Sequence, residues 1–174
     1  VEAGFEFSLA LTSDGRVYSW GGNTFGNLGD GTNYSRYTPV EVDTSGVLSG
    51  KVVIDIAAAA AAAGAVTSDG LVFTWGYNSD GRLGDGTTTD RHLPVAVDTS
   101  GALSGKVVTQ LDVGNTRFVA VSSDGLAFGW GPNPRGAIGD GTDTARLTPV
   151  AVDMTGVLSG KTITAACVNY YNTL

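Results

Sequence analysis

The chain alternates short runs of β-branched and apolar residues with polar stretches rich in Gly, Asp, Ser and Thr. This pattern is typical of β-strands joined by tight turns. Four kinds of run recur in a fixed order. A β-branched run such as KVVIDI precedes an apolar run such as FSLALT, then a run ending in Trp-Gly such as RVYSWG, then a run such as TPVEVD. The sequence therefore predicts an all-β fold made of repeated four-stranded units.

The repeat has a spacing of 55 residues without insertion or deletion, marked by Trp20, Trp75 and Trp130. TSDG at 12–15, GDGT at 29–32 and VDTSGVLSGK at 42–51 each return twice at that spacing, with few changes. Four strands per repeat of about this length are the signature of a β-propeller blade. We expect blades at residues 1–55, 56–110 and 111–165, the first starting mid-blade, and the beginning of a fourth repeat at 166–174.

Two local features support the strand boundaries. Asp-Gly pairs at 14–15, 69–70 and 124–125 separate the second and third strands of each repeat. Asp-Gly predicts a type I′ hairpin, in which both central residues have positive φ. Pro39, Pro94 and Pro149 stand near the beginning of the fourth strand, where a missing N–H removes no ladder hydrogen bond.

The stretch SLALTSDGRVYSWGGNTFGNLGDGT…TPVEV resembles the regulator of chromosome condensation repeat. The resemblance covers nearly the whole chain and implies blades of a seven-bladed β-propeller. The GDGT…R…TPV motif and the VDTSGVLSGK linker are more similar to repeats of bacterial secreted or surface proteins than to those of the nuclear exchange factor of this family. Three repeats do not close a propeller, which needs about 4–8 blades. We therefore expect a partial propeller or a segment of a longer chain, completed by further repeats or by other copies.

Seven consecutive alanines at 57–63 interrupt the repeat. Alanine favours helices, yet the unchanged spacing argues against a helical insertion. Two other interpretations remain open: a true substitution packed as a tight strand, or positions where alanine stands for side chains that were never identified. We favour the second, which also weakens any argument from Cys167.

Composition excludes several classes of function. The net charge is −7, and the 10 Lys and Arg residues are scattered, which disfavours nucleic-acid binding. Nine of the 17 acidic residues are Asp at three repeated turn positions, so acidity is no sign of a cationic partner. No apolar run has the length of a membrane helix. The one cysteine forms no disulfide framework.

The remaining chemistry has structural explanations. Asp30, Asp85 and Asp140 of GDGT are turn-capping carboxylates rather than calcium ligands. The repeated tryptophans indicate packing between blades rather than a carbohydrate platform or the light-sensing cluster of a plant relative. Arg36, Arg91 and Arg146 are interpreted as loop braces. His92 and Cys167 lack repeated or neighbouring catalytic partners. We expect no catalytic, metal or cofactor site, and no enzyme activity.

Variation between the copies is concentrated in the loop after each tryptophan. Rigid scaffolds present recognition residues on such loops, although neutral drift would give the same variation. The candidate partner-binding residues are Phe25, Asn27, Tyr34, Asp80, Arg82 and Arg135.

Near-identical linkers, low charge and no catalytic constellation favour a non-catalytic structural or adhesive module of a secreted or cell-surface bacterial protein. Its partners would be other protein chains or further repeats, including copies of itself. One alternative is a propeller that binds one defined partner, as exchange factors and enzyme inhibitors of this family do. The other is an accessory module of a larger enzyme.

Overall fold

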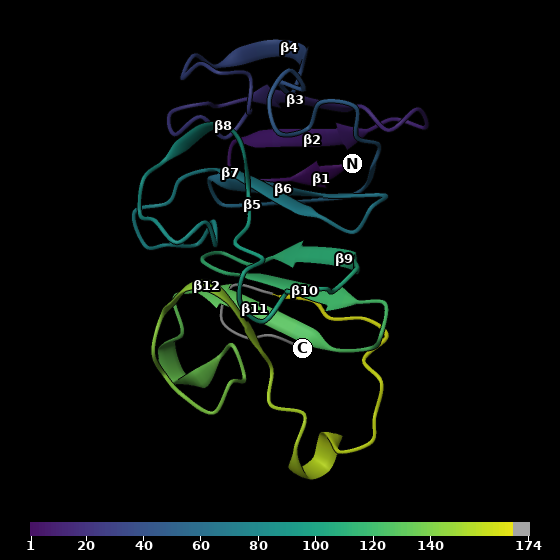
Figure 1. Cartoon of the computed structure of the whole chain (residues 1–174). Coiled ribbons are helices and arrows are strands. Elements are labelled where there is room, and N and C mark those ends of the chain that lie inside the picture. The colour runs from purple at the N-terminus through teal and green to yellow at the C-terminus, as the bar shows by residue number, and fades with distance from the viewer. Residues whose placement is uncertain (169–174) are drawn as a thin grey trace.

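Three antiparallel four-stranded sheets stack against one another in the computed structural model, which describes residues 1–168 (Figure 1). Blade 1 contains β1 (Glu2–Ala3), β2 (Phe7–Leu11), β3 (Val17–Gly21) and β4 (Arg36–Glu41). Blade 2 contains β5 (Val53–Ala59), β6 (Ala62–Thr67), β7 (Val72–Gly76) and β8 (Arg91–Ala96). Blade 3 contains β9 (Val108–Val113), β10 (Phe118–Ser122), β11 (Ala127–Gly131) and β12 (Arg146–Ala151). The predicted all-β, partial-propeller fold is confirmed.

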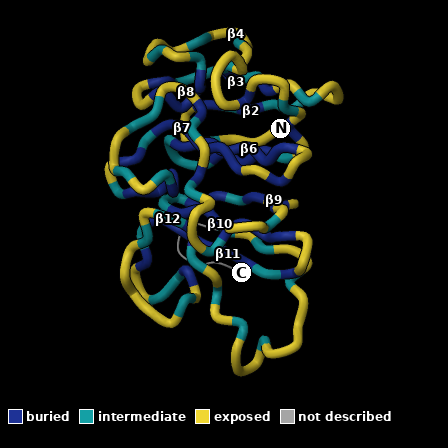
Figure 2. The backbone as a smooth tube through the Cα atoms, in the orientation of Figure 1, coloured by how far each residue is buried: buried dark blue, intermediate teal, exposed yellow. Residues whose placement is uncertain are grey.

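Each blade runs from an inner first strand to an outer fourth strand. The inner strand β5 contacts both β1 and β9, whereas β4, β8 and β12 each pair on one side only. The outer strands are correspondingly exposed, and the middle strands of blades 2 and 3 are buried throughout (Figure 2). Two 3₁₀ turns, Pro134–Gly136 and Gly156–Leu158, complete the secondary structure of the described residues.

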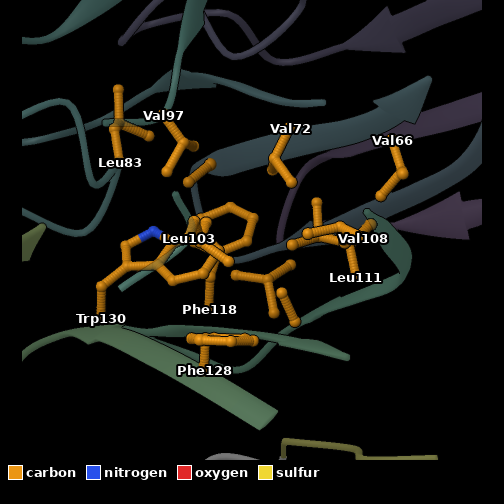
Figure 3. Close-up of a cluster of buried hydrophobic side chains, with 14 residues drawn as sticks. Val66, Val72, Leu83, Val97, Leu103, Val108, Leu111, Phe118, Phe128 and Trp130 are labelled. Carbon is orange, nitrogen blue, oxygen red and sulfur yellow. The ribbon is translucent and has the colours of Figure 1, made fainter. Parts of the chain in front are cut away.

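The core lies between the blades. One apolar cluster joins blades 1 and 2, and a second joins blades 2 and 3. Trp75 and Trp130 are fully buried in these clusters, and Figure 3 shows Trp130 facing Leu83 across the second interface. The indole of Trp130 also stacks on Phe118, with ring centroids 5.7 Å apart. Packing between blades, the predicted role of the repeated tryptophans, is confirmed at these two positions.

The hairpins between the second and third strands differ from the prediction. In blade 1, Gly15 N–H donates to Thr12 O at 2.9 Å, and Thr12 N–H donates to Arg16 O at 2.9 Å. Only the glycine has positive φ, +81°, and Asp14 does not. The loop is therefore a type I turn followed by a glycine bulge, and the predicted type I′ turn is wrong. Leu11 pairs with Val17 and Thr12 is hydrogen-bonded to Arg16, so residues 13–15 form a three-residue loop. A type I′ hairpin has a loop of two residues.

The prolines also lie deeper in the fourth strand than predicted. β4 begins at Arg36, so Pro39 is inside the strand. The register between β3 and β4 shifts after Ser19, because Gly21 pairs with Arg36 while Ser19 pairs with Val40. Proline is tolerated here because the strand is at the sheet edge and is bulged.

The alanine segment forms a hairpin rather than a helix. Ala57–Ala59 end β5, and Ala62–Ala63 begin β6. Ala60 in the turn has φ +47°, a left-handed conformation. Ala62 and Ala63 are fully buried, as expected for a tight strand, and the helical interpretation is wrong. That alanine stands for unidentified side chains stays a hypothesis, which the mass of a peptide covering residues 52–70 would test.

The segment after blade 3 follows the course of another first strand. Ile163 N–H donates to Gly125 O at 2.9 Å, as Val108 does to Gly70 and Val53 to Gly15. Residues 166–168 belong to the predicted fourth repeat, and the remainder, 169–174, lies outside the described residues.

Candidate functional site

The variable loops gather at one end of the blades. Because neighbouring strands are antiparallel, the turn between the first and second strands lies beside the loop between the third and fourth. Gly22 N–H donates to Glu6 O at 2.7 Å, and Tyr77 N–H donates to Ala61 O at 2.9 Å. We call this surface the loop end: residues 4–6, 22–35, 60–61, 77–90, 114–117 and 132–145. The near-identical hairpins and connectors lie at the opposite end.

A buried asparagine organises the loop of blade 1. The Asn23 amide donates to Asp30 Oδ1 at 3.2 Å and to the carbonyls of Thr32 and Tyr34, both at 3.1 Å. Its oxygen accepts from Leu28 N–H at 2.9 Å. Asn23 is inaccessible to solvent, so all of its polar capacity serves to close the loop.

The GDGT aspartate connects this asparagine to the start of the fourth strand. Asp30 Oδ1 accepts from Thr32 N–H at 3.0 Å, and Oδ2 accepts from Arg36 Nε and Nη2, both at 2.8 Å. Burial raises the pKa of Asp30, but hydrogen bonds from Thr32 and Arg36 together lower it by more, below its usual value. The turn role of the aspartate and the bracing role of the arginine are as predicted.

The same network recurs in the other blades. Asn78, Asp85 and Arg91 form it in blade 2, with Arg91 Nε 2.8 Å from Asp85 Oδ2. In blade 3, the Arg146 Nε atom lies 2.7 Å from Asp140 Oδ2. Hydrogen bonds lower the pKa of Asp85 and of Asp140 in the same way. Sequence reasoning missed the role of the asparagines, although their 55-residue recurrence was a signal.

Phe25 and Asn27 lie in the same loop but differ in exposure. The Phe25 ring is 36% exposed and meets Tyr77 of blade 2 edge-on, with centroids 4.9 Å apart. Asn27 is buried, its amide donates to Gly22 O, and its own carbonyl accepts from Trp75 Nε1 at 3.1 Å. Asn27 therefore joins blades 1 and 2 and offers no side chain to a partner.

Arg82 likewise has its contacts within the protein. It is 6% exposed, and its guanidinium binds both carboxylate oxygens of Asp80 at 2.6 and 2.9 Å. Nη1 donates to Asn115 O of blade 3 at 2.7 Å, and Cζ lies 4.7 Å from the Tyr77 ring centroid. The row Phe25–Tyr77–Arg82–Asn115 thus crosses all three blades at the loop end.

Of the six predicted positions, Phe25, Tyr34 and Arg135 present exposed side chains, and Asp80 is partly exposed. Tyr34 is 71% exposed. Arg135 has φ +59°, a left-handed conformation in which its backbone is held by the turn. These accessible positions therefore present two aromatic rings, one cation and one carboxylate on a frame of buried polar bonds, and Glu6 and Asp143 are exposed elsewhere in the loop end. Whether it binds a partner stays a prediction.

Other candidate chemistry is sparse in residues 1–168. His92 and Cys167 are exposed, and no three His, Cys, Asp or Glu residues of this range group as metal ligands. A cavity of about 400 Å³ at the inner strands has an uncharged lining that includes Phe5, Asn115 and Val168. None of the helices in this range has the length and apolar character to cross a membrane.

Comparison with known proteins identifies the repeats. Models of the regulator of chromosome condensation (RCC1) repeat match residues 1–27 and 69–121. The ultraviolet-B receptor UVR8 of Arabidopsis thaliana is 34% identical over 152 residues, covering 87% of this chain and 33% of the receptor. The E3 ubiquitin-protein ligase HERC2 of Homo sapiens is 34% identical over 160 residues, covering 92% of this chain and 3% of the ligase.

A solved structure gives the same fold. Prp20p of Saccharomyces cerevisiae superposes with a TM-score of 0.75 at 21% identity, covering 89% of this chain and 38% of Prp20p. The chain thus spans a third or less of the two curated relatives. Its 55-residue repeats, its stacked four-stranded blades and these matches agree. The chain belongs to the regulator of chromosome condensation repeat family, and its three sheets are blades of a β-propeller.

Proposed function

We propose that this chain is a protein-binding propeller segment that recognises its partner with the loop end. The observation that carries the proposal is the contrast between a repeated frame and a varied surface. Asn, Asp and Arg close the loop in every blade, while Phe25, Asp80 and Arg135 occupy one equivalent position. A rigid frame lowers the entropic cost of binding, because its loops are ordered before the partner arrives.

Relatives of this chain support a protein as the partner. Prp20p binds Gsp1p and histones, and a second solved structure contains Kap60 bound to Prp20. The exposed aromatic rings Phe25 and Tyr34 suit such an interface, since aromatic and arginine side chains are enriched at interface centres. Arg135 adds a cation from blade 3. HERC2 is a ligase, so an accessory role beside a catalytic domain is one form of this function.

The test is affinity capture with matched variants of the chain. The loop-end variant combines Phe25→Ala, Tyr34→Ala and Arg135→Ala. The control, Val157→Ala, alters a residue that is 93% exposed at the opposite end. We expect a bound protein that the wild type and the control retain and the loop-end variant loses. The protein so identified is then purified and titrated against the same three chains. A partner whose affinity is equal for all three would refute the proposal.

A second candidate is the structural or adhesive role at a bacterial cell surface, or in the extracellular space. It is favoured by the connectors, whose exposed Ser49, Ser104 and Ser159 are identical. The connectors fold through local turns, in which Asp43 accepts from Ser45 N–H at 2.7 Å. This role predicts antibody labelling of the chain on intact cells of the source organism. Labelling only after cell lysis would contradict it.

A further inference from the structure

At the loop end, the contact between blades 2 and 3 contains a cationic side chain of the chain itself. The guanidinium of Arg82 binds the Asp80 carboxylate through Nε and Nη2, at 2.9 and 2.6 Å. Its Cζ lies 4.7 Å from the Tyr77 ring centroid, and Nη1 donates to Asn115 O of blade 3 at 2.7 Å. A carboxylate, an aromatic ring and the neighbouring blade therefore hold a cation at this position.

The equivalent position between blades 1 and 2 has no cation and is open. Asn27 stands at the position of Arg82, and its amide turns back to donate to Gly22 O. A cavity of about 80 Å³ remains between segments 5–7 and 22–27 of blade 1 and residues 60–61 of blade 2. We call it the loop crevice. Its volume is several times the roughly 10–15 Å³ that one water needs. Both walls belong to blades of this chain that pack on each other, so the crevice is a feature of an internal interface.

Aromatic side chains form much of the wall of the loop crevice. Phe5, Phe7 and Phe25 all border it. The Phe25 ring is held by its edge-on contact with Tyr77, and the Phe5 N–H donates to Ala60 O at 2.9 Å. Aromatic rings attract cations to the negative charge at their faces, and the apolar stems of Lys and Arg pack on such surfaces. The wall therefore suits a long cationic side chain.

The charge of the loop crevice is negative. Of the described residues that border it, only Glu6 is charged. A Cβ on Gly22 would lie 3.3 Å from Glu6 Oε2, which places the carboxylate beside the loop backbone of blade 1. Within residues 1–168, no Lys or Arg forms an ion pair with Glu6. The corresponding residues of blades 2 and 3 are Ala61 and Thr116, so this carboxylate distinguishes the crevice of blade 1.

We propose that the loop crevice binds a Lys or Arg side chain of the protein partner, with its charge against Glu6 and its stem between Phe5 and Phe25. Arg82 is the internal template for this contact, because it places a cation at the equivalent position one blade further on. An acidic side chain would be repelled there, and an apolar one would leave the carboxylate unpaired. The inference rests on the proposed function, since it names the chemistry of the partner that the loop end recognises.

The test uses a small cation in place of the unidentified partner. The chain is the 174-residue sequence as printed, labelled with ¹⁵N and titrated with Nα-acetyl-L-arginine methylamide while its amide resonances are followed by NMR. Nα-acetyl-L-citrulline methylamide has nearly the same shape without the charge. Sodium chloride keeps the ionic strength constant, because screening weakens exposed ion pairs. We expect saturable shifts at Glu6, Gly22 and Ala61 with a Kd of about 10 mM, and binding of the citrulline compound that is about five-fold weaker or more.

A matched pair of variants assigns the charge. Glu6→Gln keeps the size of the side chain and removes its charge, and should weaken binding of the arginine compound by about five-fold. Asp143→Asn makes the same change at an exposed carboxylate of the loop end on blade 3 and should leave binding unchanged. The dispersion of each variant's amide spectrum shows that it is folded.

Three results would overturn the inference: no saturable shift up to about 100 mM, equal binding of the arginine and citrulline compounds, or equal effects of the two variants. The compounds bind or fail to bind whether or not a partner is captured, so the proposed function is tested separately. A captured partner that the loop-end variant loses, but that binds Glu6→Gln as tightly as Asp143→Asn, would refute this inference and leave the proposed function standing.

Discussion

Replacing Trp75 or Trp130 by phenylalanine makes the same change in two equivalent interfaces with different hydrogen bonding. Both indoles are 0% exposed. Trp75 Nε1 donates to Asn27 O at 3.1 Å, whereas Trp130 Nε1 has no hydrogen-bond partner in the described part of the chain. The loss of ring volume is common to both variants. Any difference between their free energies of unfolding therefore reports mainly how the hydrogen bonding of the indole N–H contributes to stability.

The expected difference follows from the cost of buried polar groups. Trp75→Phe removes a hydrogen bond with a net stabilisation of about 1 kcal/mol. Trp130→Phe instead removes a buried, unpaired N–H, whose burial costs about 1–3 kcal/mol. We therefore expect Trp75→Phe to lower the free energy of unfolding by about 2–4 kcal/mol more than Trp130→Phe does. A urea m-value of about 2 kcal/mol/M would convert this to a midpoint difference of about 1–2 M.

Urea unfolding followed by far-UV circular dichroism measures both variants without relying on tryptophan fluorescence, which the substitutions change. Equal m-values are required before midpoints are compared, because a stack of blades can unfold in parts. Trp20→Phe serves as a control at a partly exposed ring and should cost less than either. Equal midpoints for the two variants, or a lower midpoint for Trp130→Phe, would refute the reasoning.

Three further predictions use the same unfolding assay. Arg117 is 3% exposed, two of its guanidinium nitrogens have no hydrogen-bond partner in the described residues, and burial lowers its pKa. Arg117→Phe should therefore leave the free energy of unfolding unchanged or raise it. Arg82→Met should lower the free energy of unfolding by about 2 kcal/mol or more, because the Arg82 guanidinium is hydrogen-bonded to Asp80 and Asn115. The pKa of Asp85 is lower in the folded chain than in the unfolded chain. The ionised carboxylate therefore stabilises the fold above the unfolded pKa of about 3.9, and this stabilisation is lost as pH falls through the folded pKa. Below about pH 5, the free energy of unfolding of Asp85→Asn should fall less steeply with decreasing pH than that of the wild type. Gly84→Ala, at φ +72° and against Trp130, should cost more than about 2 kcal/mol, whereas Gly101→Ala, with nothing within 4 Å, should be neutral.

Repetition in the sequence made the strands and the inter-blade tryptophans predictable. A residue that recurs every 55 positions must satisfy the same surroundings in each blade, so Trp75 and Trp130 were assigned to packing without a structure. Local turn chemistry was less decisive. Asp-Gly suits both a two-residue and a three-residue hairpin, and the pairing of Leu11 with Val17, which no local pattern reveals, selects the longer one.

The site was predicted only in part, because burial depends on contacts distant in sequence. Arg82 has a charged side chain in a variable loop, which favoured an exposed position. Its burial results from Asn115 O, 33 residues further along the chain, and from the Tyr77 ring. Asn27 is buried because its carbonyl meets Trp75, 48 residues away. Phe25, Tyr34 and Arg135 lack such distant polar partners in the described residues, and they remain at the surface.

The bracing network leaves the first two positions of each loop tip free to vary. Asn23, Asp30 and Arg36 hold the loop at its base through atoms that every blade supplies at the same positions. The tip, residues 24–27, is four residues long in each blade and keeps a glycine at its third position. The first two tip positions can therefore be exchanged between blades or replaced by designed dipeptides, whereas the fourth position stays fixed because Asn27 and Arg82 contact the next blade. The fold would then serve as a display scaffold in which each blade is diversified separately.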